Sequence, residues 1–157
     1  MERQDGSWYF AYGSNMSARQ MATRCPGATA YGPARLEGYR LAFDLPSRYW
    51  GGWVADVLPE PGSTVWGVLW RLHPEHWAIL DDYEDVDEQR YRRLTLEVVS
   101  ADGWPVRAQL YRVVTPRGEG RPSARYLATL LEGAREHGLP AEYVAWLQSL
   151  ASEEVMP

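Results

Sequence analysis

The sequence predicts an α+β fold: a small mixed, mostly antiparallel β-barrel with flanking helices. Segments rich in aromatic and β-branched residues come early in the chain and are joined by hairpin-type turns. Residues 65–70, VWGVLW, are apolar on both faces, as is typical of a strand covered on both sides. With 157 residues, of which 45% are hydrophobic, we expect one domain over 1–157 with frayed ends at 1–7 and 151–157.

Strands are expected where apolar residues recur with a period of two. The segment GGWVADVLPEPGSTVWGVLW predicts a hairpin whose turn is Pro59–Ser63, and Asp102 and Gly103 predict a second hairpin turn. Gly38 interrupts the strand that precedes the first hairpin. The expected strands cover residues 7–12, 34–45, the two arms of 51–70, 91–100 and 106–113.

Helices are expected where start and stop signals flank a helical pattern. Ser17 is a candidate N-cap for the first helix, which a Cys-Pro-Gly triplet ends. The second begins at His-Pro-Glu, with proline and an acid in its first turn. The third is amphipathic and is followed by Gly138. The expected helices cover residues 18–24, 73–82, 123–137 and 140–150.

Composition excludes several classes of function. The net charge of −5 makes the chain a poor binder of nucleic acid. All 16 basic residues are arginine, so a catalytic lysine is excluded. Cys25 is the single cysteine and the three histidines form no HExxH motif, so we expect no metal.

No apolar run approaches membrane-spanning length and no signal-peptide core begins the chain, so we expect a cytoplasmic protein without a membrane partner. The eight tryptophans fit a core or a homodimer interface.

The stretch YGSN, residues 12–15, ends the first expected strand just before a helix. Gly13 lets a ligand approach the backbone closely, while Ser14 and Asn15 can cap the helix or donate hydrogen bonds. Such a loop presents free N–H groups that can hold an anion, although it matches neither a P-loop nor a dinucleotide-binding glycine pattern. A plain capped turn and an oxyanion or carboxylate cradle both remain open.

The stretch ILDDYEDVDEQRYRR, residues 79–93, carries six acidic residues between a helix and a strand. Such a run is usually a solvated loop, but Glu84 has Tyr83 and Val86 beside it. Apolar surroundings raise the pKa of a carboxyl, which then can carry protons near neutral pH. Cys25 has no evident partner and no serine lies in a GxSxG motif, so a protein nucleophile is not indicated. A carboxylate pair for glycoside hydrolysis stays open.

The sequence resembles the gamma-glutamylcyclotransferases. The resemblance depends on YFAYGSNM, GGWVADVLPEPGSTVWGVLW, LDDYEDVDEQRY and GAREHGLPAEYVAWL, which come in the family's order and cover about residues 9–147. It implies a small mixed barrel with flanking helices. It also implies that the substrate's α-amino group attacks its own γ-glutamyl carbonyl, which releases 5-oxoproline and an amino acid or amine. The nucleophile belongs to the small-molecule substrate, so no cofactor or metal is implied.

By position, the resemblance implies that Glu84 is the catalytic acid/base. Five residues match the family's substrate loop, whose backbone N–H groups would hold the glutamyl unit: Tyr12, Gly13, Ser14, Asn15 and Met16. Three tyrosines match pocket positions of the family, with core packing as the alternative for each: Tyr91, Tyr111 and Tyr126.

One departure concerns Asp85, which stands where the family often has glycine. Its carboxylate could raise the pKa of Glu84 or point to solvent, and together with Asp87 and Glu88 it could attract a cationic leaving group. Three hypotheses follow: a gamma-glutamylcyclotransferase, an enzyme that cleaves γ-glutamyl amines or a γ-glutamyl-protected natural product, and a catalytically silent barrel that binds a small ligand or a protein.

Overall fold

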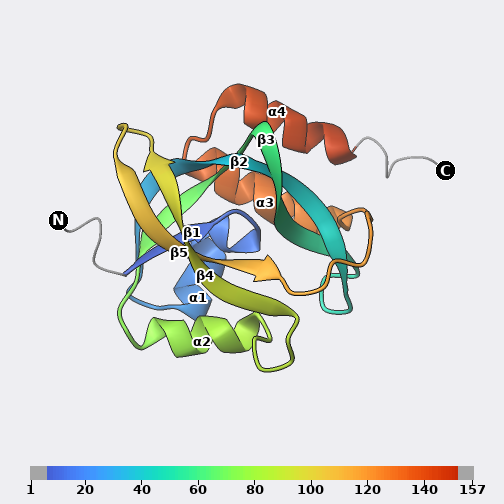
Figure 1. The fold of residues 1–157 in the computed structure, drawn as a ribbon, viewed down its shortest axis with the longest axis horizontal. Coiled ribbons are helices and arrows are strands. Elements are labelled where there is room, and N and C mark those ends of the chain that lie inside the picture. The colour runs from blue at the N-terminus through green and yellow to red at the C-terminus, as the bar shows by residue number, and fades with distance from the viewer. Residues whose placement is uncertain (1–6, 152–157) are drawn as a thin grey trace.

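Five strands close into a barrel in the order β1-β3-β2-β4-β5 in a computed structural model that describes residues 7–151 (Figure 1). All neighbouring strands are antiparallel except β1 and β5, so the predicted α+β barrel is confirmed. The termini predicted to fray lie largely outside the described residues. The strands are β1 (Trp8–Ala11), β2 (Thr29–Ser47), β3 (Gly52–Arg71), β4 (Tyr91–Ser100) and β5 (Pro105–Val113).

The two longest strands, β2 and β3, form one hairpin that spans the barrel. The predicted hairpin turn at Pro59–Ser63 is wrong, because that segment lies within β3. Tyr39 pairs with Pro59 and Glu37 pairs with Thr64, so residues 60–63 bulge opposite Gly38 alone. Proline without an N–H and Gly62 at φ 88° suit a bulge as well as a turn, and the sequence signal does not separate them.

The barrel closes through β1, whose four residues are all buried. On one side β1 pairs antiparallel with β3, from Trp8–Arg71 to Ala11–Val68. On the other side it meets β5 in parallel at Tyr9 and Gln109. The predicted β4–β5 hairpin is confirmed, with Gly103 at φ 90° in its turn.

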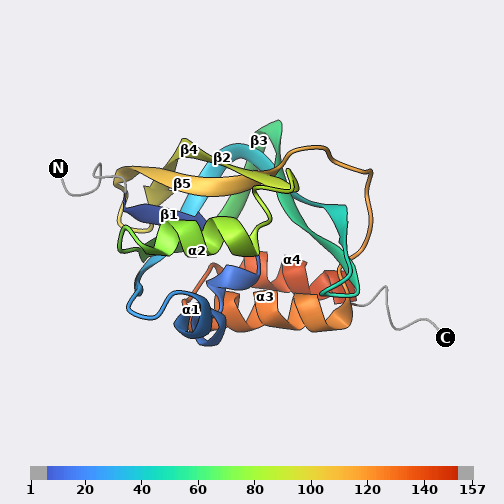
Figure 2. The same cartoon turned by 90° about the horizontal axis from the view of Figure 1, so that it is seen from below.

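The helices cover the barrel and also hold its first loop in place. Figure 2 shows α3 and α4 together on one side of the strands. Ser17 and Ser123 cap α1 and α3 as predicted for Ser17, each accepting a hydrogen bond from a backbone N–H of the first turn. The predicted apolar face of α3 is buried. The helices are α1 (Ala18–Arg24), α2 (His76–Tyr83), α3 (Ala124–Glu136) and α4 (Ala141–Ser149).

Helix α3 packs against a 3-10 turn, η2 (Ser14–Met16), that follows β1. A Cβ at Gly133 would lie 2.5 Å from the carbonyl carbon of Met16 and 2.7 Å from the nitrogen of Ser17. Ser17 Oγ donates to Glu132 Oε2 at 3.0 Å. The C-terminal helix layer therefore fixes the loop that sequence analysis singled out near the N-terminus.

Among residues 7–151, no helix is long and apolar enough to cross a membrane. In the same described part of the chain, no group of three or more His, Cys, Asp or Glu side chains is placed to hold a metal ion.

Candidate active site

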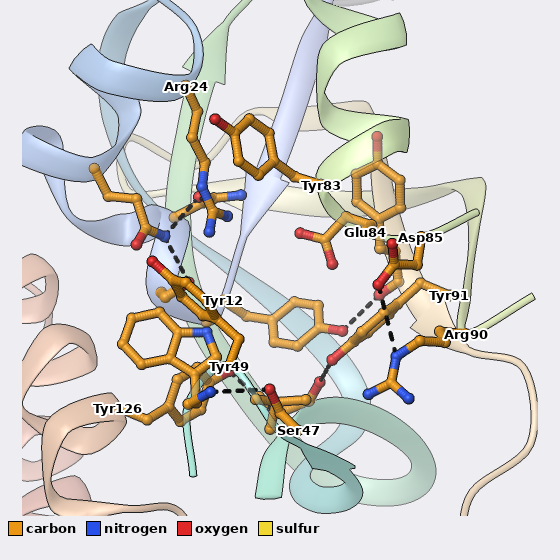
Figure 3. Close-up of a pocket in the computed structure, with 18 of the residues that line it drawn as sticks. Tyr12, Arg24, Ser47, Tyr49, Tyr83, Glu84, Asp85, Arg90, Tyr91 and Tyr126 are labelled. Carbon is orange, nitrogen blue, oxygen red and sulfur yellow. Dashed lines mark hydrogen bonds and ion pairs between the residues drawn. The ribbon is translucent and has the colours of Figure 1, made fainter. Parts of the chain in front are cut away.

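A pocket of about 550 Å³ gathers the residues that the sequence singled out (Figure 3). Its walls come from β1, the following loop, α1, the β2–β3 hairpin, the C-terminus of α2, β4, β5 and α3. Met16 is the exception among the predicted residues: its side chain is fully buried in the core and does not line the pocket. The predicted residues that line the pocket are Tyr12, Gly13, Ser14, Asn15, Glu84, Tyr91, Tyr111 and Tyr126.

The loop after β1 presents unused donors to this pocket. Within the described part of the chain, the N–H groups of Gly13, Ser14 and Asn15 donate no hydrogen bond, whereas that of Met16 donates to the Gly13 carbonyl at 3.1 Å. A Cβ at Gly13 would lie 3.0 Å from the Tyr126 hydroxyl, so glycine permits the close approach of this ring. Three adjacent N–H groups can therefore hold an anion or an oxyanion here.

Asn15, the single asparagine of the chain, organises this loop through its side chain. It is 3% exposed, and its Nδ2 donates to the Tyr9 hydroxyl at 2.9 Å. Its Oδ1 accepts from Gln20 Nε2 at 2.9 Å and from Arg24 Nη1 at 3.1 Å. Because every polar atom of the amide has a protein partner, Asn15 shapes the nest and leaves the backbone N–H groups to a ligand.

Glu84 caps the C-terminus of α2, where its own N–H donates to the Leu80 carbonyl at 2.9 Å. Figure 3 shows its carboxylate directed into the pocket, with Arg24 on one side and Asp85 on the other. Burial raises the pKa of Glu84 to about 7, the charge of Arg24 lowers it, and the charges of Asp85 and Asp81 raise it. Such a carboxyl exists in both protonation states near neutral pH, as a proton carrier requires.

Asp85 has a backbone conformation that suits glycine, the residue that the resemblance implies at this position. Its φ is 55°, in the left-handed region that glycine favours and that aspartate tolerates better than most residues. The turn beside Glu84 is thus compatible with the substitution. The Asp85 carboxylate lies 3.8 Å from Arg90 Nε, while Asp87 and Glu88 are exposed and do not line the pocket.

Four of the tyrosines that line the pocket, those predicted from the sequence, have hydroxyls that are hydrogen-bonded within the protein. Tyr12 donates to the Tyr111 carbonyl at 2.5 Å, and Tyr111 donates to Asp81 Oδ1 at 2.7 Å. Tyr91 donates to the Ala55 carbonyl at 2.5 Å, and the Ala55 N–H donates to Tyr126 Oη at 3.0 Å. Burial raises the pKa of each of these phenols, so all are neutral at physiological pH.

Several lining residues were missed by sequence reasoning. Gln20 and Arg24 lie one turn apart on α1, and the Arg24 guanidinium stacks 4.3 Å from the centre of the Tyr83 ring. Their spacing of four, directly after the loop, was a usable signal. Tyr49 and Trp50 come from the turn between β2 and β3. The sequence predicts a hairpin turn at 59–63 instead, so it gives no reason to single out these two residues.

Comparison with known proteins defines the family. The model of the AIG2-like family matches residues 64–147. The gamma-glutamylcyclotransferase of Bos taurus is 34% identical over 156 residues, which cover 96% of this chain and 82% of that protein. The Homo sapiens gamma-glutamylcyclotransferase is 32% identical over 146 residues, or 90% of this chain and 77% of that protein.

The fold points the same way. A solved structure of a gamma-glutamyl cyclotransferase matches with a TM-score of 0.87 and 32% identity, covering 90% of this chain and 86% of that one. Fold and site together define a class of protein: a small closed barrel that has a carboxyl group and a loop of N–H donors in one pocket. The chain belongs to the AIG2-like gamma-glutamylcyclotransferase family, and its curated relatives are enzymes.

Proposed function

We propose that this protein is a gamma-glutamylcyclotransferase that converts a γ-glutamyl compound into 5-oxoproline and a free amino acid or amine. The observation that carries the proposal is the presence, in one pocket, of a carboxyl with a pKa near 7 and a loop of unused N–H donors. The reaction needs a proton carrier and an oxyanion site but no nucleophile from the protein. The names of the relatives support the same reaction.

In the proposed mechanism, ionised Glu84 accepts a proton from the substrate's α-ammonium group. The freed amine attacks the γ-carbonyl carbon of the same glutamyl unit, and a C–N bond forms as the carbonyl oxygen becomes negative. The N–H groups of Gly13, Ser14 and Asn15 stabilise that oxygen. Protonated Glu84 then gives its proton to the departing nitrogen as the original amide bond breaks. The Glu84 carboxylate so regenerated takes the second proton of the ring nitrogen and passes it to solvent, which leaves the neutral lactam of 5-oxoproline and the free amine. A pKa of about 7 suits both proton transfers, because neither direction is strongly uphill.

The tyrosine walls would hold the substrate in the bent shape that ring closure needs. Ordering the chain before reaction removes entropy from the barrier. The rings of Tyr12, Tyr91, Tyr111 and Tyr126 give rigid, largely apolar surfaces because their hydroxyls are anchored within the protein. They also keep water away from the reacting carbonyl and so strengthen the electrostatic contribution of the loop.

The charges around the pocket favour a leaving group that carries a carboxylate. A groove of about 630 Å³ adjoins the pocket and shares Ser47, Tyr49, Asp85 and Arg90 with it. The charged residues that line the groove are three arginines and one aspartate: Arg48, Arg90, Arg117 and Asp85. Because the groove is positive and Asp87 and Glu88 line neither the groove nor the pocket, a γ-glutamyl amino acid fits better than a γ-glutamyl amine.

We further propose that the enzyme works as one domain in the cytoplasm on a free small molecule. The net charge of −5 supports a partner other than nucleic acid. The mechanism above uses only protein and substrate groups, so it calls for no cofactor. A homodimer would be compatible with this mechanism, since all residues invoked come from one chain.

The test is incubation of the purified protein with γ-glutamyl amino acids, γ-glutamyl amines and glutathione, with 5-oxoproline measured by mass spectrometry. We expect 5-oxoproline from the γ-glutamyl amino acids. Glu84→Gln should still bind but lose roughly 10²–10⁴ in rate, as expected for a general acid–base group. Asp87→Asn, outside the pocket, is the matched control and should retain full rate. Thermal stabilisation by these compounds without turnover would instead favour the silent binding barrel.

A further inference from the structure

Two buried carboxyls lie outside the pocket and take no part in the mechanism above. Asp44 is 2% exposed and Asp56 is 1% exposed. Asp44 is the extra residue of a bulge in β2, between the pairs Phe43–Ala55 and Leu45–Val54, and Asp56 is on the facing strand β3. Asp56 pairs with Ala42, so Asp44 and Asp56 are diagonal neighbours across the β2–β3 ladder.

Their hydrogen bonds are strongly asymmetric. Asp56 Oδ1 accepts from the N–H groups of Val57 at 2.8 Å and Val113 at 3.0 Å. The other three carboxyl oxygens, Asp56 Oδ2 and both of Asp44, have no donor among the described residues. Two adjacent buried carboxylates with three bare oxygens would be very costly, and one proton between them turns two of those acceptors into a hydrogen bond.

The surroundings indicate which carboxyl carries the proton. Two backbone N–H groups already donate to Asp56 Oδ1, whereas neither carboxyl oxygen of Asp44 has a donor among the described residues. Burial, Asp56 and the nearby Glu119 all raise the pKa of Asp44 well above the usual carboxyl range. The neutral phenols of Tyr12, which directly follows β1, and of Tyr91 on β4 also lie close to Asp56. A proton held by Asp44 could therefore be donated to the bare Oδ2 of Asp56.

The acid pair, meaning Asp44 and Asp56, is directly connected to the tyrosine anchors of the pocket. Ala55, one residue before Asp56, accepts from the Tyr91 hydroxyl and donates to that of Tyr126. Val57, one residue after it, accepts from Arg112 Nε at 3.1 Å. Asp56 Oδ1 also ties β3 to β5 at Val113. Any displacement of Asp56 thus moves the backbone that holds both rings.

We propose that Asp44 and Asp56 share one proton and that this acid pair positions Tyr91 and Tyr126 through the backbone of Ala55. When the proton leaves, two buried negative charges repel each other, the β2 bulge and β3 separate locally, and the tyrosines lose their fixed geometry. The pair is a positioning device, because neither carboxyl lines the pocket. The effect on substrate rests on the proposed function, whereas the shared proton and the backbone coupling do not.

The shared proton is tested by unfolding in urea across a pH series. Because the pKa of Asp44 is higher in the folded than in the unfolded chain, its contribution to stability is full below pH about 4 and declines as the pH rises to the raised pKa. Asp44→Asn lacks this titration, and its amide can donate to Asp56 in the same way. We therefore expect Asp44→Asn to gain stability relative to the wild type as the pH rises, whereas Glu119→Gln should follow the wild type closely. Equal pH slopes for the wild type and Asp44→Asn would overturn the shared proton.

The positioning role is tested first without any ligand. A double-mutant cycle combines Asp44→Ala with Tyr91→Phe, and the unfolding free energies should be non-additive because both act on the same backbone segment. Tyr31→Phe, whose hydroxyl bonds exposed Asp102 far from the pair, is the matched control and should be additive with Asp44→Ala. Additivity of Asp44→Ala with Tyr91→Phe would overturn the positioning role, even if the proton is shared.

Affinity for 5-oxoproline gives the functional readout. Binding to the wild type should weaken at alkaline pH more than binding to Asp44→Asn, while Glu84 titrates equally in both proteins. Asp44→Asn should retain the neutral-pH affinity that Asp44→Ala loses. Identical pH profiles for the wild type and Asp44→Asn would overturn the proposal. If neither the wild type nor the variants bind or produce 5-oxoproline, the proposed function fails. The unfolding measurements then still test whether the acid pair shares a proton and positions the tyrosines.

Discussion

Replacing Gly133 by alanine tests how tightly α3 holds the loop after β1. On propensity alone, alanine should stabilise the interior of this helix by about 1 kcal/mol over glycine. The structure predicts the opposite sign. The new Cβ would lie 2.5 Å from the carbonyl carbon of Met16, 2.6 Å from its Cβ and 2.7 Å from the nitrogen of Ser17.

The magnitude follows from the atoms involved. Two of the three contacts are backbone atoms, which cannot rotate aside as the end of a flexible side chain can. Overpacking of this kind typically costs about 1–3 kcal/mol, and we take the upper part of that range because the helix or the loop must shift. After subtraction of the propensity gain, Gly133→Ala should lose roughly 1–2 kcal/mol of unfolding free energy.

Urea denaturation monitored by tryptophan fluorescence measures this loss. The control is Ala128→Gly at an exposed position of the same helix, which should lose about 1 kcal/mol from propensity alone. Turnover should also fall in Gly133→Ala, because Met16 and Ser17 follow directly on the donors of the loop. A Gly133→Ala protein more stable than the wild type would refute the close packing of α3 on η2.

Two further predictions concern the pKa of Glu84, which is measured as the midpoint of the acidic limb in a plot of kcat/KM against pH. In the wild type kcat/KM should rise as the pH passes about 7, because the proposed base is the ionised carboxylate. Arg24→Gln removes the charge that lowers this pKa and should move the limb to higher pH; an unmoved limb would mean that Glu84 is not the titrating group. Asp85→Gly removes a charge that raises the pKa and should move the limb to lower pH. Since it also relieves a positive φ, its unfolding free energy should stay equal or rise by up to about 1 kcal/mol, and a clear loss in urea would contradict this account.

Local signals in the sequence were sufficient for most elements. The first helix and its serine cap, and the fourth strand over residues 91–100, were predicted with the bounds that the structure has, because each carries its own start, period or stop signal. The β2–β3 pairing was not predictable in this way. Proline and glycine at 59–63 suit a turn and a bulge equally, and only pairing with β2 over its whole length separates the two.

The site residues, too, fall into those that local sequence patterns indicate and those that depend on contacts between distant segments. The YGSN loop and Glu84 could be singled out because they form short stretches with recognisable chemistry, and the structure brings both to one pocket. Arg24, Tyr49 and Trp50 reach that pocket through packing of α1 and of the β2–β3 turn, which depends on contacts between distant segments. The inward direction of Met16 depends on α3, more than a hundred residues further along, and no local pattern encodes it.

The parallel contact between β1 and β5 has a consequence for the order of folding. The first strand to be synthesised must wait for β3 and then for Gln109 of β5 before it has both neighbours, and the loop behind it must wait for α3. Closure of such distant contacts is slow, because the entropy of a long loop is lost before the contacts stabilise it. The candidate active-site pocket is therefore assembled last, and a partly folded chain contains Glu84 and the YGSN loop without bringing them together.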